Sequence, residues 1–172
     1  DSAGIAVTDG RHMHIKKGMG LVNDVFKDGL KGLDGYIAAG HVRYSPNGAS
    51  MTYNVQPLKV FYDGGNLAMS HNGNLTNAAE LRKELAADGV VFQTTIDSEV
   101  VLSLIALSRK KTLPERVAEA ADTIKGAFAI LIMNDSQLIA FRDPYGFRPL
   151  CLGRLDHGWV VASATCALDL VG

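Results

Sequence analysis

The sequence has little of what defines several common classes of protein. Only two of its 172 residues are cysteines, too few for a disulfide framework or a thiolate metal cage, which favours a reducing, intracellular setting. Acidic and basic side chains almost balance, with a formal net charge of -1, whereas surfaces for nucleic acid or anionic membrane need clustered positive charge. The longest strongly apolar stretch, residues 127–133, is far too short to cross a bilayer. We therefore expect a soluble, cytoplasmic domain with neither nucleic acid nor membrane as a partner.

The sequence does contain short apolar runs separated by turn residues, with no repeat or linker that would divide the chain. Runs rich in β-branched or apolar residues, bounded by Gly, Asn and Asp, predict strands. They occupy residues 3–7, 36–42, 58–62, 67–70, 127–133, 137–142 and 159–163.

Three segments in the middle of the chain predict helices. In residues 76–87 the apolar positions recur at spacings of three and four and so share one helix face. Residues 97–109 repeat this pattern, with acidic side chains in the first turn, as the helix dipole favours. A third helix should begin at Thr112, where Glu115 completes a capping box, and end at Gly126. Because strands and helices are grouped, we expect an α+β layered sandwich of antiparallel sheets with helices outside.

Four sites at the ends of these elements carry side chains suited to chemistry. Arg43, at a strand end, could hold a carboxylate through two parallel hydrogen bonds. Asn72 and the backbone of Gly73, in a turn after another strand, could stabilise an oxyanion. Asp97, opening the second helix, could accept a substrate ammonium, and residues 143–150 form a turn-rich run between strands. Taken singly, each is explained more simply by a surface salt bridge, a tight turn, helix capping or a hairpin connection.

Nothing in the sequence indicates a nucleophile or a metal site. Cys151 and Cys166 have apolar neighbours and are expected to be small buried hydrophobic residues rather than thiolates. The five histidines show no spacing that would assemble a metal site on one helix. Metal binding by this chain is therefore not predicted.

Taken together and in order, the motifs resemble the glutaminase domain of the glutamine phosphoribosylpyrophosphate amidotransferases (amidophosphoribosyltransferases), which belong to the N-terminal-nucleophile amidotransferases. The resemblance covers essentially the whole chain, residues 1–172. It rests on eight blocks at compatible spacing: DSAGIA (1–6), GHVRYS (40–45), NVQP (54–57), HNGNL (71–75), DSEV (97–100), GAF (126–128), DPYGFRPL (143–150) and AS with TCA (162–167). Single blocks would be weak evidence, but their order is specific.

The resemblance implies a fold and a set of site residues. The implied fold is a four-layer αββα sandwich of antiparallel sheets, incomplete at its N-terminus because the family's nucleophilic cysteine would precede Asp1. Transferred by position, Arg43 would bind the α-carboxylate of glutamine and Asp97 its α-ammonium. Asn72 with the backbone of Gly73 would form the oxyanion hole. In the family the first residue supplies both thiol and base, so the chain alone is expected to be inactive.

The resemblance also implies an activity for the complete protein. Glutamine would be hydrolysed and its ammonia delivered to phosphoribosyl pyrophosphate in a separate phosphoribosyltransferase domain, which forms 5-phosphoribosylamine in the first committed step of de novo purine synthesis. That domain would use Mg²⁺, and the complete protein would be a homo-oligomer with a possible iron–sulfur cluster, while this chain would need no cofactor. Two alternatives stay open: a non-catalytic glutamine-binding module, and the glutaminase domain of a hexosamine-forming amidotransferase.

Two positions depart from the family pattern. Pro46 stands where a hydroxyl residue is expected, which would affect a hydrogen bond to substrate, and Ala164 stands where an acidic residue is expected. Loss of the first strand from a central sheet would also expose unpaired edges. We therefore expect the isolated chain to be poorly soluble or to pair with another copy.

Overall fold

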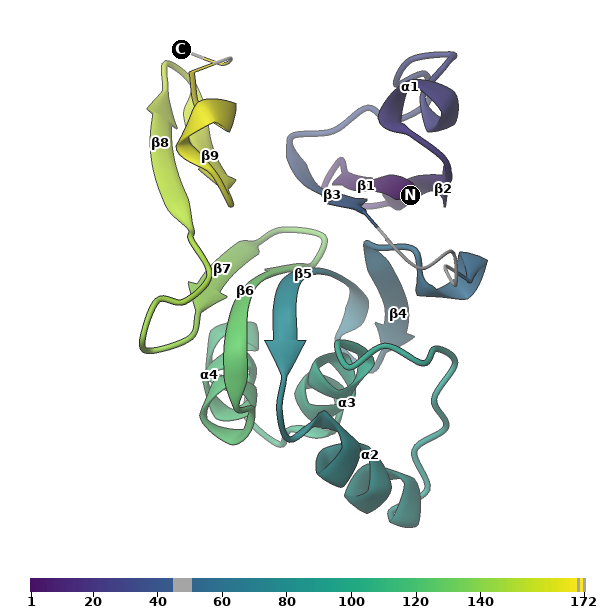
Figure 1. Ribbon diagram of the computed structural model, residues 1–172, viewed down its shortest axis with the longest axis vertical. Coiled ribbons are helices and arrows are strands. Elements are labelled where there is room, and N and C mark those ends of the chain that lie inside the picture. The colour runs from purple at the N-terminus through teal and green to yellow at the C-terminus, as the bar shows by residue number, and fades with distance from the viewer. Residues whose placement is uncertain (45–50, 170, 172) are drawn as a thin grey trace.

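The computed structural model describes residues 1–44, 51–169 and 171, and it contains two antiparallel sheets and a separate hairpin (Figure 1). The first sheet has the order β2-β1-β3, from β1 (Ser2–Thr8), β2 (Met13–Met19) and β3 (Ile37–Arg43). The second has the order β4-β5-β6-β7, from β4 (Leu58–Tyr62), β5 (Gly65–Leu75), β6 (Gly126–Met133) and β7 (Leu138–Arg142). The hairpin consists of β8 (Cys151–Leu155) and β9 (Gly158–Ala162). Pro46 lies outside the described residues.

The second sheet is covered by three helices, whereas the first sheet is covered by a single helical turn. Helices α2 (Ala78–Ala87), α3 (Glu99–Leu107) and α4 (Leu113–Thr123) cover one face of the second sheet, and the first sheet lies against its other face (Figure 1). The single turn α1 (Val22–Val25) packs on the outside of the first sheet. Two short 3-10 turns, Thr52–Asn54 and Thr165–Ala167, complete the elements. The predicted α+β class with antiparallel sheets is confirmed, and the layer order is helix, sheet, sheet, helix.

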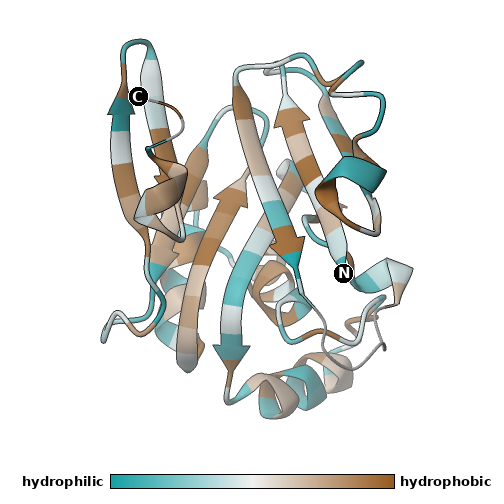
Figure 2. Cartoon of the chain, turned by 45° about the horizontal axis from the view of Figure 1, so that its top comes forward, coloured by the Kyte–Doolittle hydropathy of each residue, from teal (hydrophilic) through white to brown (hydrophobic). Residues whose placement is uncertain are grey.

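The apolar core has a large part and a small part. Between the second sheet and its helices lie long side chains with no exposed surface, among them Met69, Ile105 and Ile130. Between the two sheets the cluster is smaller and built mainly from short side chains such as Ala6, Ala39 and Ala68. Figure 2 shows the apolar residues, in brown, concentrated on the strands. Most of the apolar burial therefore lies on the helical side of the second sheet.

The capping box predicted for the third helix is confirmed, but the predicted end of this helix is wrong. The Thr112 N–H donates to Glu115 Oε2 at 3.0 Å, and the Glu115 N–H donates to Thr112 Oγ1 at 3.4 Å. The helix ends at Thr123, and Gly126 is the first residue of β6, where it pairs with Leu75. Its φ of +145° explains why glycine stands there without ending a helix.

Other sequence-based boundaries also need correction. The second helix begins at Glu99 and ends at Leu107, so Asp97 precedes it. The strands β2 and β8 and the turn α1 were not predicted, because their residues alternate with polar, Gly or Lys positions that mask the apolar pattern. Cys166 is exposed and Cys151 only partly buried, so the expectation of two buried cysteines is wrong.

Candidate active site

The pairing of β1 with β3 fixes the direction in which Arg43 points. Arg43 is the last residue of β3 and lies opposite Ser2, while His41 lies opposite Gly4. His41 reaches across to the second sheet, where its Nε2 donates to the carbonyl oxygen of His71 at 3.1 Å. Because residues two apart on a strand share a face, Arg43 belongs to the same face. The guanidinium is therefore carried on the side of β3 that looks toward the second sheet.

Asn72 and Gly73 lie inside a strand rather than in the turn that the sequence predicted. β5 runs on to Leu75, and these two residues pair with Ala129 and Phe128 of β6. Gly73 has φ +146°, and a Cβ at this position would lie 2.7 Å from the Cα of Phe128. No side chain fits there, so the sequence needs glycine for the close approach of the two backbones.

Alternation along β5 places Asn72 on the face of the strand that looks toward the first sheet. Met69 belongs to the core on the helical side and Ala68 to the core between the sheets. Even-numbered residues of this part of β5 thus face the first sheet. Asn72 therefore faces the same space between the sheets as Arg43.

Asp97 is tied to the end of β5 by a backbone hydrogen bond. Its Oδ2 accepts the Leu75 N–H at 2.8 Å, and its Oδ1 accepts the hydroxyl of Ser98 at 3.2 Å. The Ser98 oxygen lies 2.7 Å from Nδ1 of His71. The same Nδ1 atom lies 3.6 Å from Asp97 Oδ1. The side chain of Asp97 keeps 23% of its surface exposed, whereas that of His71 keeps 1%. The Asp97 carboxylate is thus fixed by hydrogen bonds from the protein and still has a surface open to a ligand.

Two pKa shifts follow from these contacts. Burial raises the pKa of Asp97, but the adjacent His71 side chain and the hydrogen bond from the Leu75 N–H outweigh burial and hold this pKa below its ordinary value. Burial lowers the pKa of His41 despite its hydrogen bond to the His71 carbonyl, and the nearby charge of Arg43 acts in the same direction. At neutral pH Asp97 is therefore ionised and His41 is neutral.

The segment that leads into Asp97 is fixed from two sides. The Arg82 guanidinium donates to the carbonyl oxygens of Thr94 at 3.0 Å and Ile96 at 2.7 Å, and it lies 4.1 Å from the centroid of the Phe92 ring. The Glu99 carboxylate accepts the backbone N–H groups of residues 93 and 94. An irregular stretch is thereby held in one conformation up to the carboxylate.

Residues 143–150 approach the same end of the molecule. Asp143, only 2% exposed, accepts the N–H groups of Tyr145 and Phe147 at 3.1 Å and that of Phe128 at 3.2 Å. Burial raises the pKa of Asp143, but these backbone hydrogen bonds bring it below its ordinary value. The loop joins β7 to the separate hairpin and so does not close a hairpin of its own.

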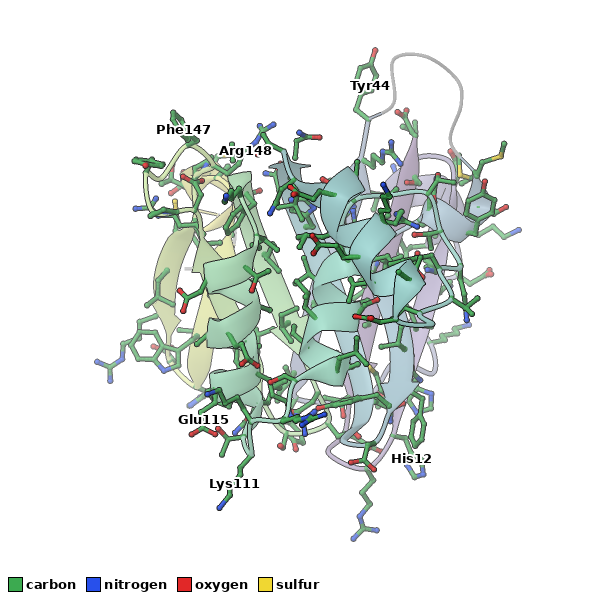
Figure 3. All side chains as sticks on the ribbon, turned by 90° about the horizontal axis from the view of Figure 1, so that it is seen from below. His12, Tyr44, Lys111, Glu115, Phe147 and Arg148 are labelled. Atoms are coloured by element: carbon green, nitrogen blue, oxygen red, sulfur yellow. The ribbon has the colours of Figure 1, made fainter. Side chains whose placement is uncertain are left out.

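Figure 3 shows Tyr44, the residue after Arg43, at the same end of the molecule as Phe147 and Arg148. His12, Lys111 and Glu115 lie at the opposite end. The four residues Arg43, Asn72, Gly73 and Asp97 thus come from both sheets and from the approach to α3. The buried partners His71 and Ser98 and the half-buried His41 were not assigned a role from the sequence, although His71 and Ser98 stand next to predicted site residues.

The described residues, 1–44, 51–169 and 171, contain neither a cluster of metal-binding side chains nor a membrane-spanning helix. Within these residues no group of three or more His, Cys, Asp or Glu side chains could hold a metal ion. The same residues include no helix with the length and apolar character needed to cross a membrane.

Comparison with known proteins identifies the class. A family model described as a glutamine amidotransferase domain matches residues 41–169. The chain therefore belongs to the glutamine amidotransferase domain family. This range contains all four of the predicted site residues.

Within this family the chain is similar over its whole length to amidophosphoribosyltransferases. It is 47% identical to amidophosphoribosyltransferase 3 of Arabidopsis thaliana over 99% of the chain, and 44% identical to the Bacillus subtilis enzyme over 100% of it. These matches cover 32% and 37% of the two relatives, so the chain spans about a third of their length.

The solved structures agree with these relatives. Glutamine phosphoribosylpyrophosphate amidotransferase from B. subtilis, solved with ADP and GMP, superposes with a TM-score of 0.94 at 43% identity, covering 99% of this chain and 37% of that one. A protein from Pseudomonas aeruginosa that is described as a predicted glutamine amidotransferase shares only the fold, with a TM-score of 0.54 and 18% identity over 94% of this chain and 70% of the other.

Proposed function

We propose that this chain is the glutamine-binding part of an amidophosphoribosyltransferase. The observation that carries the proposal is the hydrogen bond from Leu75 to Asp97, which brings an ionised carboxylate to the strand that holds Asn72 and Gly73, with Arg43 facing them. A cationic and an anionic side chain flanking an amide-bearing strand suit a zwitterionic amino acid with a side-chain amide. Glutamine has this chemistry, and the names of the relatives support it.

Each group has a role in the proposed reaction. Arg43 binds the α-carboxylate through its planar guanidinium, and Asp97 binds the α-ammonium. A thiolate contributed from outside this chain attacks the side-chain amide carbon, and the Asn72 amide with the Gly73 N–H stabilises the oxyanion that forms. The amine that took the proton of the thiol gives it to the leaving nitrogen, and collapse of this intermediate breaks the C–N bond, releases ammonia and leaves a thioester. Water then hydrolyses the thioester to glutamate.

The ammonia would be used in a second step. By analogy with the named relatives, it attacks phosphoribosyl pyrophosphate, displaces pyrophosphate and forms 5-phosphoribosylamine. Residues beyond this chain would carry that step, so the Mg²⁺ ion and the iron–sulfur cluster implied by the resemblance stay predictions about them. The homo-oligomeric state and the cytoplasmic location also stay predictions. The Arabidopsis relative is a chloroplast protein, so members of this group occur in more than one compartment.

The proposal is tested on the complete native polypeptide that carries this chain. Glutamate release from glutamine is measured for Arg43→Ala, with exposed Arg109→Ala as the matched control. Removing one member of a buried charge pair costs about 2 to 5 kcal/mol, so we expect the glutamine KM to rise by about 30-fold or more and the control to change little. An unchanged KM would remove Arg43 from the site.

The acceptor is tested with the same preparation. Formation of phosphoribosylamine from phosphoribosyl pyrophosphate supports the proposal, whereas transfer to fructose 6-phosphate would show a hexosamine-forming enzyme. Calorimetry that detects glutamine binding without any turnover would show a non-catalytic binding module.

A further inference from the structure

A buried row of polar groups lies directly behind the proposed ammonium site. It runs from the His71 ring through the Ser98 hydroxyl to the Asp97 carboxylate, with distances of 2.7 Å and 3.2 Å. His71 is 4% exposed and Ser98 1% exposed, although both face an otherwise apolar core. Buried polar side chains are retained only with partners, so this row needs a specific explanation.

The positions of the protons follow from the partners. An ionised carboxylate only accepts, so Ser98 must give its single proton to Asp97 and accept a hydrogen bond from His71. That places the ring proton of His71 on Nδ1. The opposite arrangement would put the proton on Nε2, which is buried and has no hydrogen-bond partner among the described residues. An unsatisfied buried donor is costly, so the first arrangement is favoured.

The backbone of His71 is fixed as firmly as its ring. Gln56 accepts the His71 N–H at 2.7 Å, and its amide nitrogen is 3.4 Å from the His71 carbonyl oxygen, which also accepts from His41. The pairing of β4 with β5 ends at Leu58 and Met69, so the Gln56 side chain takes the place of the missing neighbouring strand. The backbone of His71 is therefore fixed, so its ring is held in position to hydrogen-bond Ser98.

We propose that His71 is a positioning residue that orients the Asp97 carboxylate through Ser98 for binding of the substrate ammonium. This inference rests on the proposed binding of glutamine by Asp97. His71 touches no reacting atom. Its effect is that one carboxylate oxygen is held by Ser98 and the other by Leu75, so the carboxylate plane is fixed before the ligand arrives. Orientation in advance lowers the entropy lost on binding.

The test uses steady-state glutamate release by the complete native polypeptide. His71→Leu removes the donor, whereas His71→Asn places an amide nitrogen near the position of Nδ1 and can still donate to Ser98. We expect His71→Leu and Ser98→Ala to raise the glutamine KM about fivefold to tenfold with a smaller change in kcat, and His71→Asn to restore most of the affinity. Thermal unfolding of each variant establishes that it is folded.

A ligand without the α-amino group separates positioning from a general structural role. Glutaramate, which is glutamine without this group, is measured as a competitive inhibitor. If His71 acts through the ammonium site, His71→Leu leaves the inhibition constant of glutaramate unchanged. Equal losses of affinity for glutamine and glutaramate, or a His71→Asn enzyme as impaired as His71→Leu, would overturn the inference.

Asp97→Asn, with exposed Asp88→Asn as its control, distinguishes this inference from the proposed function. A raised glutamine KM for Asp97→Asn together with unaffected His71 variants overturns the positioning role alone. An unchanged KM for Asp97→Asn overturns the proposed ammonium site and the positioning role with it.

Discussion

Replacing Gly73 by alanine should destabilise the fold far more than the same change at Gly89 or Gly158. Its φ of +146° belongs to a region that residues with a Cβ rarely adopt, and the new atom would lie 2.7 Å from the Cα of Phe128. The backbone conformation costs about 1 to 3 kcal/mol and the overpacking about the same again. We expect a total loss of about 2 to 6 kcal/mol, against a typical domain stability of roughly 5 to 15 kcal/mol.

Two other glycines separate the two causes. Gly89 has φ +91° but nothing within 4 Å of its added Cβ, so Gly89→Ala should cost only the conformational part, about 1 to 2 kcal/mol. Gly158 has neither a positive φ in this range nor a close neighbour, so Gly158→Ala should be neutral or slightly stabilising.

The three variants are compared by equilibrium urea unfolding followed by far-ultraviolet circular dichroism. The free energies of unfolding should fall in the order Gly158→Ala, Gly89→Ala, Gly73→Ala. The steric reasoning is refuted if Gly73→Ala is no less stable than Gly89→Ala, because both share the positive φ and only Gly73 has the backbone contact.

Three further predictions concern partly buried polar side chains. Burial lowers the folded-state pKa of His41, so the unfolded chain binds more protons and stability should decline as the pH falls below about 6.5, by at most about 1.4 kcal/mol per pH unit. His41→Gln should remove this decline in urea midpoints measured at pH 7.5 and 5.5, and an identical decline would count against it. Lys17 donates to the carbonyls of Val55 and Pro57 at 2.6 and 3.0 Å, so Lys17→Met should lower the free energy of unfolding by about 1 to 3 kcal/mol in a urea titration, whereas exposed Lys31→Met should not. Arg82→Lys keeps the charge but loses the planar fork that binds two carbonyls, and hydrogen exchange of residues 92–96 should become faster; unchanged protection would show that the fork does not hold this segment.

The elements that could be predicted from the sequence are those whose signal is local. The helix start at Thr112 depends on two residues one turn apart, and the capping box there is as expected. Gly126 was misassigned because a glycine after a helical stretch resembles a helix end. Here the close approach of its backbone to that of β5 requires glycine. Strand β2 carries two lysines in its middle, so tertiary pairing with β1, rather than its own pattern, makes it a strand.

The candidate site also contains residues that a local sequence signal indicates and residues that only tertiary contacts bring together. The types of Arg43 and Asp97 and their place at element ends suggested their chemistry, and their roles stay predictions. The contacts among His71, Ser98 and Gln56 join segments up to 42 positions apart in the sequence, from 56 to 98, so no local pattern contains them. The position of Asp97 before the helix likewise depends on the Leu75 N–H, which only the folded chain brings near.

The unequal division of the apolar core has a consequence for motion. Local unfolding is easiest where few large side chains are buried. The sheet that carries Arg43 rests on a small cluster in which three of the five buried residues are alanines, while the strand that carries Asn72 rests on the large core. The first sheet should therefore open more often than the second. A ligand bound by both Arg43 and Asp97 would connect the first sheet to the second. Binding at the site should therefore reduce the local unfolding of β1 and β2.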